Sequence, residues 1–303
     1  MAERDMRNAI ALTAFASLLW GTSFPGVKWG LDFVGNDMLF LWIRFVVATA
    51  LTLVVMSYLK RFKFSILKEP VIWLIGLLNA GSFIAQYVGL TLTTASKTAL
   101  LVDINVVAVA IVSFFVFSER LARMQLGGIL VGIVGIVLLT SCGGVSFQSG
   151  EFLGDVLVFA SGWGWAFFII LNKKMLAKHT AFELSTAAIA TSMVWLVLPV
   201  IYLFYSGADF SIEPTGWLAM VYLGISCTSI ATLLWAMGLE GVSATASATI
   251  MLLEVVVALV ISIGLLSETL TTTAAVGALL ILAAIYLVSA GGRKIEKYPI
   301  SLT

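Results

Sequence analysis

The chain has 303 residues, of which 61% are apolar and only 11% are charged, against about 25% charged residues in a typical soluble domain. This composition excludes an ordinary soluble domain and predicts an integral membrane protein. The net charge of +1 is close to neutral, so the placement of the charges is more informative than their sum. Cys142 and Cys227 lie in different apolar segments with no CxxC spacing, which indicates neither a metal site nor a disulfide.

The chain starts with a short charged head that runs into a long apolar segment without a small-residue cleavage site. We therefore predict a retained first helix, not a signal peptide. About 20 apolar residues cross a hydrocarbon core of about 30 Å as a helix, and ten segments qualify, so we expect an all-α integral membrane fold with ten transmembrane helices. The segments lie near residues 8–29, 37–58, 70–90, 93–117, 121–141, 151–172, 184–205, 214–237, 242–266 and 271–291.

Basic residues are distributed unevenly between the predicted loops. Lys28, Arg44 and Lys97 fall within the hydrophobic segments, and the other fourteen of the 17 basic residues all fall on one side if the segments alternate in direction. Lys and Arg near helix ends favour the cytoplasmic side. The pattern predicts a multi-pass protein of the plasma or inner membrane with both termini in the cytoplasm.

The two halves of the chain are similar to each other. Over the later segments of each half the offset is constant at 149 positions, and no gap is needed. We predict a first five-helix unit at 1–141, a second unit at 151–291 and a cytoplasmic tail at 292–303. Because five is odd, the second unit enters the membrane inverted, an arrangement typical of secondary transporters. Aligned pairs are Gly89 with Gly238, Ala95 with Ala244, Ser118 with Ser267, Glu119 with Glu268, Gly128 with Gly277 and, at an offset of 145, Trp20 with Trp165 and Lys28 with Lys173.

Several short motifs occur in a family-specific order. They are Trp20-Gly21-Thr22-Ser23-Phe24, Lys28, Arg44-Phe45, Ser118-Glu119-Arg120-Leu121 and Ser267-Glu268-Thr269-Leu270. Together with the two five-helix units they resemble the drug/metabolite transporter superfamily and, within it, the EamA family of ten-helix permeases. The resemblance implies transport of small metabolites such as amino acids. Members of this family often carry proline midway along the fourth and ninth helices, where this chain has Val106 and Val255, so local unwinding is not expected from these positions.

Three polar residues lie deepest in the predicted membrane: Asp103, Asn105 and Glu254. Asn105 and Glu254 occupy equivalent positions in the two halves. At 100° per residue, Asp103 and Asn105 point about 160° apart on one helix, so we expect Asn105 and Glu254 to face a central cavity and Asp103 to face a neighbouring helix. Glu254 would bind a substrate ammonium group or carry a coupling proton; the alternative is a protonated carboxyl with one interhelical hydrogen bond.

Other candidates lie farther from the centre. We expect the long stem of Lys97 to reach the headgroups at the outer surface. Arg44 is deeper, and its planar fork suits either a substrate carboxylate or phosphate or an internal ion pair. Trp20 and Trp165 are predicted near mid-depth, where they would either stack on a planar substrate or pack between helices.

Four further residues form a symmetric pattern. Lys28 and Glu268 are predicted at the outer surface, and their repeat mates Lys173 and Glu119 at the inner one. The hypothesis is two equivalent ion pairs, one at each mouth, that form and break as the halves rock. The alternative is that Glu119 and Glu268 cap the helices that follow them.

Motifs of other function classes are missing. There is no HExxH, the single histidine, His179, falls in a cytoplasmic loop, and there is no GxxxxGK[ST] loop. We therefore expect no enzymatic activity, no catalytic residue, no metal and no cofactor. The expected partners are the bilayer and a small solute, and no nucleic acid. The sequence leaves monomer and homodimer open. The prediction is a secondary transporter of an amino acid or related amphipathic solute, with export favoured; the alternatives are an uncoupled channel or facilitator and an intramembrane enzyme.

Overall fold

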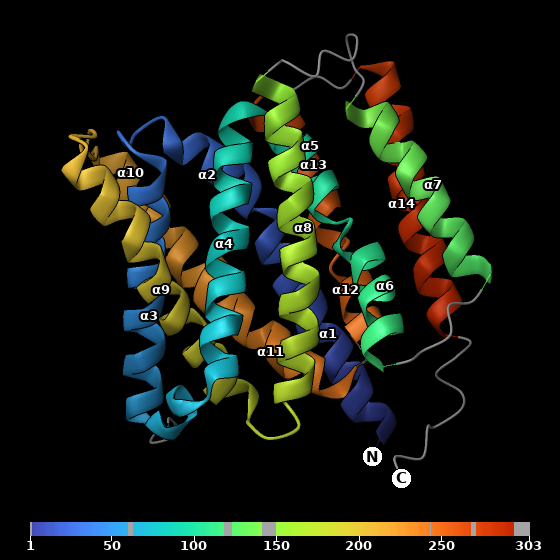
Figure 1. Cartoon of the computed structure of the whole chain (residues 1–303), viewed down its shortest axis with the longest axis horizontal. Helices are drawn as coiled ribbons and strands as arrows, with labels where there is room; N and C mark the ends of the chain where they lie inside the picture. Colours follow the sequence, from blue (N-terminus) through green and yellow to red (C-terminus); the bar gives the residue numbers. More distant parts are fainter. Residues whose placement is uncertain are drawn as a thin grey trace.

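The computed structural model describes residues 2–59, 63–117, 123–140, 150–242, 244–267 and 271–293. Over these ranges the chain is mainly helical, with short turns between the helices, and contains no β-strand. Two extended residues, Val34 and Ile212, form an isolated antiparallel bridge between the two halves of the chain. Figure 1 shows the helices side by side, with most of them running between the upper and lower edges of the molecule.

Helices occupy each of the ten predicted segments within the described residues. The first half contains α1 (Ala2–Gly21), α2 (Ser23–Leu31), α3 (Asp37–Tyr58), the 3-10 helix η1 (Phe64–Lys68), α4 (Pro70–Leu92), α5 (Ala95–Val102), α6 (Asn105–Phe117) and α7 (Arg123–Thr140). The second half contains α8 (Gly150–Met175), α9 (Ala181–Tyr205), α10 (Pro214–Tyr222), the π-helix η2 (Leu223–Ile230), α11 (Ala231–Gly241), α12 (Ala244–Ile250), α13 (Leu253–Leu265) and α14 (Thr272–Arg293).

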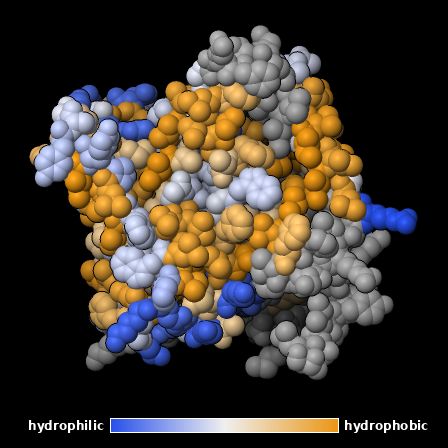
Figure 2. All heavy atoms as spheres, in the orientation of Figure 1, coloured by the Kyte–Doolittle hydropathy of each residue, from blue (hydrophilic) through white to orange (hydrophobic). Residues whose placement is uncertain are grey.

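Seven helical stretches are long and apolar enough to cross a membrane. They are Met6–Leu31, Asp37–Tyr58, Pro70–Leu92, Ala95–Val112, Gly150–Met175, Ala181–Tyr205 and Pro214–Gly241. Shorter apolar helices cover Leu126–Gly135, Leu253–Leu265 and Ala275–Ala284. Figure 2 shows hydrophobic residues over much of the visible face, with strongly hydrophilic residues mainly toward its edges. Such a surface suits contact with lipid around the middle of the molecule.

Local sequence sets the start of several helices. The Asn36 side chain accepts hydrogen bonds from the backbone N–H groups of Met38 and Leu39 at the start of α3, which satisfies two otherwise unpaired donors. Pro70 begins α4, where its missing N–H costs nothing. Thr180 and Glu183 form a reciprocal capping box at the start of α9.

Packing brings the two halves of the chain together. Helix α4 of the first half packs against α8 and α9 of the second, and α1 packs against α11. Helices α7 and α14 pack against each other along one side of the molecule, at the right of Figure 1. The centre of the bundle is therefore built by helices from both halves.

Two predicted helices are interrupted in the middle. The segment at 93–117 is α5 and α6, separated by Asp103 and Ile104, and the segment at 242–266 contains α12 and α13, separated by Met251 and Leu252. The expectation of continuous helices here is wrong, and the breaks form without proline. Asp103 and Leu252 are 149 positions apart, so the two breaks overlap under the repeat and differ by one residue.

Neighbouring helices contact the backbone at both breaks. The Met251 carbonyl, in the break between α12 and α13, accepts a hydrogen bond from the Ser17 hydroxyl at 2.7 Å. At the other break, Gly162 of α8 lies so close that a Cβ atom there would be 2.9 Å from the Val102 carbonyl oxygen. Freed backbone groups inside a membrane are tolerated where protein or a water-filled cavity surrounds them. The breaks therefore form without proline, at positions where α1 and α8 pack against them.

Candidate substrate-binding site

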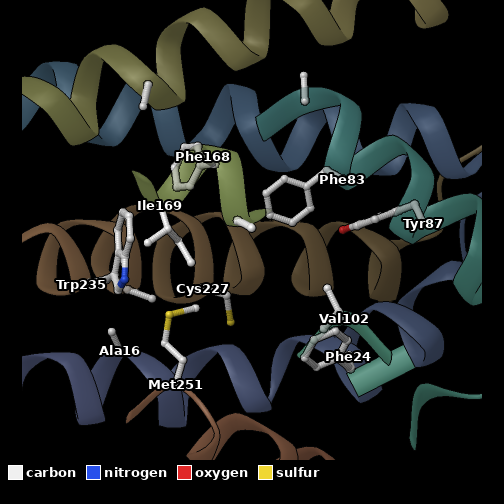
Figure 3. Close-up of a cluster of buried hydrophobic side chains, with 14 of the residues drawn as sticks. Ala16, Phe24, Phe83, Tyr87, Val102, Phe168, Ile169, Cys227, Trp235 and Met251 are labelled. Carbon is white, nitrogen blue, oxygen red and sulfur yellow. The ribbon is translucent and has the colours of Figure 1, made fainter. Parts of the chain in front are cut away.

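A cavity lies between the two halves, next to both helix breaks. It contains about 510 Å³ of space free of atoms, including the part that opens outward. Its polar wall residues are Ser23, Arg44, Gln86, Asn105 and Glu254, and its aromatic ones are Trp20, Phe24, Phe83, Trp165, Phe168 and Trp235. In Figure 3, Phe83 and Phe168 lie across from Phe24 and Met251. A mainly apolar cavity with a few convergent polar groups is typical of small-molecule sites.

Arg44 is the only cation on the described wall of this cavity, and it is 1% exposed. Its Nε donates to Thr228 Oγ1 at 2.6 Å, and its Nη1 donates to Ser23 Oγ at 3.1 Å and to Tyr87 Oη at 3.0 Å. The guanidinium also lies over the Phe83 ring, 5.1 Å from its centroid. These contacts come from α2, α4 and η2, so packing from both halves fixes the orientation of the guanidinium.

No carboxylate in the described parts of the chain balances the charge of Arg44. No ion pair involves it within the described parts of the chain, and its Nη2 atom has no hydrogen-bond partner there. A guanidinium has five N–H donors, and the three contacts above use three of them. Two donors on one nitrogen therefore remain, in a side chain that lines the cavity. An ion pair that removes Arg44 from the site, one of the two interpretations of the sequence, is not formed among these residues.

The deep polar residues are divided between the cavity wall and the packing behind it. Asn105 and Glu254 are 2% and 5% exposed and line the cavity. The Asn105 Oδ1 atom accepts no hydrogen bond from the described residues. Asp103 is fully buried, is not part of the wall, and lies within hydrogen-bonding range of the Glu254 side chain. The contact thus joins Asp103 of the first half to Glu254 of the second half. The roles of Asp103, Asn105 and Glu254 remain predictions.

Trp20 and Trp165 both line the cavity, although they come from different halves. The Trp20 indole donates to the Cys227 carbonyl oxygen at 2.7 Å, and the Trp165 indole donates to Gln86 Oε1 at 3.4 Å. These hydrogen bonds fix the orientation of both rings. The flat faces are left for packing or for stacking on a bound solute.

Lys97 has partners that the sequence did not predict. Its side chain is only 8% exposed and forms ion pairs with Glu151 at 2.5 Å and Asp155 at 3.6 Å, and Thr93 donates to Asp155 at 2.9 Å. Both carboxylates belong to the start of α8, more than fifty positions away in sequence. The buried stem of Lys97 is therefore held by α8, and its place at the outer surface stays a prediction.

Lys28 and Lys173 make equivalent contacts. Lys28 Nζ donates to the carbonyl oxygens of Leu90 and Thr93, both at 2.8 Å. Lys173 Nζ donates to those of Leu239 and Val242, both at 2.7 Å. These carbonyls end α4 and α11, where a cation also interacts favourably with the helix dipole. The predicted partners Glu268 and Glu119 lie outside the described residues, so the gate hypothesis stays a prediction.

Several wall residues were not selected by sequence reasoning. Gln86 had a usable signal, because it is an amide within the apolar segment at 70–90. Ser23 lies in the motif Trp20-Gly21-Thr22-Ser23-Phe24, which gave it no role of its own. Phe83, Phe168 and Trp235 had no signal, since aromatic residues also pack between ordinary membrane helices. Only the three-dimensional arrangement assigns them to the cavity.

The helical fold, the apolar surface and the mainly apolar central cavity with its few polar groups are those of a multi-pass membrane protein. The EamA-like transporter family model matches residues 7–141 and again residues 152–290. The chain therefore belongs to the EamA-like transporter family, and it is a membrane transporter of the drug/metabolite transporter superfamily.

Relatives of similar length are transporters by name. An "Uncharacterized transporter" of Archaeoglobus fulgidus is 28% identical over 92% of this chain and 96% of its own. A "Probable amino-acid metabolite efflux pump" of Salmonella typhimurium is 28% identical over 91% of this chain and 93% of its own. A solved crystal structure is similar with a TM-score of 0.70, at 21% identity over 95% of this chain and 98% of that one, which shows the shared fold alone.

Proposed function

We propose that the protein is a secondary transporter that exports an amino acid, or a closely related amphipathic zwitterion, by alternating access. The observation that carries the proposal is the buried guanidinium of Arg44, which lines the cavity with two free N–H donors and no carboxylate partner among the described residues. A planar guanidinium fork fits a carboxylate in a bidentate manner. Glu254 supplies the opposite charge on the same wall and would receive the ammonium group.

The rest of the cavity suits an apolar side chain on that zwitterion. Six aromatic residues form much of the wall, and Phe168 stacks on Trp235 with ring centroids 5.5 Å apart. Burial of an aliphatic or aromatic side chain against such rings is favourable by about 25 cal/mol per Å² of apolar area. The proposed substrates are therefore amino acids with large apolar or aromatic side chains. The printed name of the Salmonella relative, an amino-acid metabolite efflux pump, supports this class and supports export.

Alternating access would use two inverted five-helix units with ten crossings. Support comes from the separate family matches to the two halves, the coincident helix breaks, and the equivalent contacts of Lys28 and Lys173. We further propose that the protein lies in the cell membrane with both termini in the cytoplasm, because the basic loops favour that side. Gating by Lys28 with Glu268 and by Lys173 with Glu119 is part of the same proposal.

Counterflow in proteoliposomes tests the proposal. Vesicles that contain purified protein and unlabelled L-phenylalanine should accumulate labelled L-phenylalanine from outside, with saturation and with stimulation by the internal amino acid. Phenethylamine and 3-phenylpropionate, which lack the carboxylate and the ammonium group respectively, should compete more weakly than L-phenylalanine. Flux that neither saturates nor responds to internal substrate would indicate a channel. If L-phenylalanine, L-tryptophan and L-leucine all fail to exchange, the proposed substrate class is wrong.

A further inference from the structure

Asp103 and Glu254 form a contact between two carboxyl groups in the centre of the molecule. They are 0% and 5% exposed, and their side chains are within hydrogen-bonding range of each other. Neither oxygen of Asp103 accepts a hydrogen bond from any N–H or hydroxyl donor in the described residues. Two ionised carboxylates contain only acceptors and repel each other. A hydrogen bond between them therefore requires that at least one of the two carries a proton.

Within the described residues no cation forms an ion pair with Asp103 or Glu254. Helix α5, which Asp103 follows, and helix α13, which contains Glu254, pack against each other and against α1, α2, α4 and α8. The cavity wall adds Arg44 of α3. The charged or titratable groups with described side chains on these packing elements and on the wall are Arg7, Lys28, Arg44, Tyr87, Lys97, Glu151, Asp155, Lys173 and Lys174.

Three of the lysines among these groups have other partners. Lys97 pairs with Glu151 and Asp155, and Lys28 and Lys173 bind the carbonyl groups at the ends of α4 and α11. Arg44 bonds to Thr228, Ser23 and Tyr87 and forms no ion pair with either carboxyl among the described residues. Because a buried charge without a partner is costly, an empty cavity favours a pair that carries no net charge, with a proton on each carboxyl.

Only one side of the pair has access to the cavity. Glu254 lines the wall, whereas Asp103 lies behind it. A proton can therefore leave or enter through Glu254. The two residues also sit at the two helix breaks: Asp103 follows α5, and Glu254 is in the first turn of α13. Since α5 belongs to the first half and α13 to the second, relative movement of the halves would alter the contact.

We propose that Asp103 and Glu254 form a proton-binding site, and that a substrate ammonium group entering the cavity exchanges for one of its protons. The O–H bond of Glu254 breaks, its proton passes to water in the cavity, and the resulting carboxylate pairs with the ammonium group. Asp103 keeps its proton, and its O–H group donates a hydrogen bond to the Glu254 carboxylate. Asp103 is thus a positioning residue. One ammonium charge enters and one proton leaves, so the pair with its ligand stays neutral. This exchange step rests on the proposed function.

Infrared difference spectroscopy tests the proton site without any substrate. Purified protein in lipid should show the C=O stretching band of a protonated carboxyl that disappears at alkaline pH and shifts in D2O. Glu254→Gln and Asp103→Asn should each remove this band or its pH dependence. Asp155→Asn alters another buried carboxyl and serves as the matched control, in which the band should persist. A band that both variants leave unchanged would overturn the proton site.

Proton release tests the exchange. Phenethylamine, which carries an ammonium group and no carboxylate, is added to weakly buffered protein with a pH-sensitive dye, and L-phenylalanine is added in a parallel sample. About one proton should be released per bound ammonium ion, and release should be lost in Glu254→Gln and reduced in Asp103→Asn. Binding of either compound without proton release would overturn the exchange. If only L-phenylalanine fails to bind, the proposed substrate class is wrong while the phenethylamine and infrared results still decide the proton site.

Discussion

Replacement of Arg44 provides the most direct test of substrate binding. Arg44→Lys keeps a positive charge on α3 but removes the planar fork, and Arg44→Gln removes the charge as well. In both variants the two unused Nη2 donors are lost from a side chain that lines the cavity. We expect weaker binding of L-phenylalanine in both, with the larger loss in Arg44→Gln.

The size of the effect follows from the two unused N–H donors. A hydrogen bond to a charged group contributes about 1.5–3 kcal/mol, so two such bonds to a substrate carboxylate contribute roughly 3–6 kcal/mol. At about 1.4 kcal/mol per tenfold change, Arg44→Gln should raise the half-saturating concentration by roughly 10²- to 10⁴-fold. Arg44→Lys should fall between this variant and the wild type, because an ammonium retains the charge but gives up the bidentate geometry.

The assay is counterflow of labelled L-phenylalanine, with phenethylamine as a competitor. The wild-type preference for L-phenylalanine over phenethylamine should largely disappear in Arg44→Gln, because the proposed contact with the carboxylate, which phenethylamine lacks, is removed. Thr52→Val serves as a control on the same helix, since the Thr52 hydroxyl bonds only to carbonyls of its own helix and does not line the cavity. If the folded Arg44→Gln protein keeps the wild-type preference, Arg44 does not bind the carboxylate and the reasoning is refuted.

Two further predictions concern stability, measured by thermal unfolding in detergent. Gly21→Ala should lower the free energy of unfolding by about 1–3 kcal/mol, because the new Cβ atom would be 2.7 Å from the Glu254 carbonyl oxygen. Gly81→Ala is the control: no atom lies within 4 Å of its Cβ position, so the change should be neutral or slightly stabilising. Equal effects of the two variants would contradict the close packing of α1 on α13. Lys97→Met should lower the free energy of unfolding by about 3–5 kcal/mol, because it leaves Asp155 buried without its cation. The double variant with Asp155→Asn should recover part of this loss. If the single variant is as stable as the wild type, the ion pair is not needed for stability.

Hydropathy alone located the helical segments closely. The segment predicted at 37–58 coincides with α3, and the segments predicted at 70–90 and 184–205 correspond to α4 (Pro70–Leu92) and α9 (Ala181–Tyr205). This succeeds because a membrane helix satisfies its own backbone hydrogen bonds, so composition over about 20 residues is sufficient to define it. Interruptions inside such a segment depend on contacts with other helices, and those contacts are not encoded in a local window.

The candidate site shows the same division. Arg44, Asn105, Glu254, Trp20 and Trp165 were selected because polar or aromatic groups at mid-depth are expensive or unusual in lipid, and all five line the cavity. Their neighbours across the cavity could not be assigned, because a phenylalanine on a membrane helix has the same sequence signal whether it faces lipid, another helix or a substrate.

By itself the sequence determined the composition of a membrane protein, the ten helical segments, the similarity of the two halves and the identity of the costly buried groups. Only the tertiary structure decided which groups meet. Lys97 pairs with carboxylates of α8, Asp103 contacts Glu254 from 151 positions away, and Arg44 has no carboxylate partner among the described residues. The reason is physical: the free energy of a buried charge depends on its partners within a few ångströms, and those partners come from distant parts of the chain.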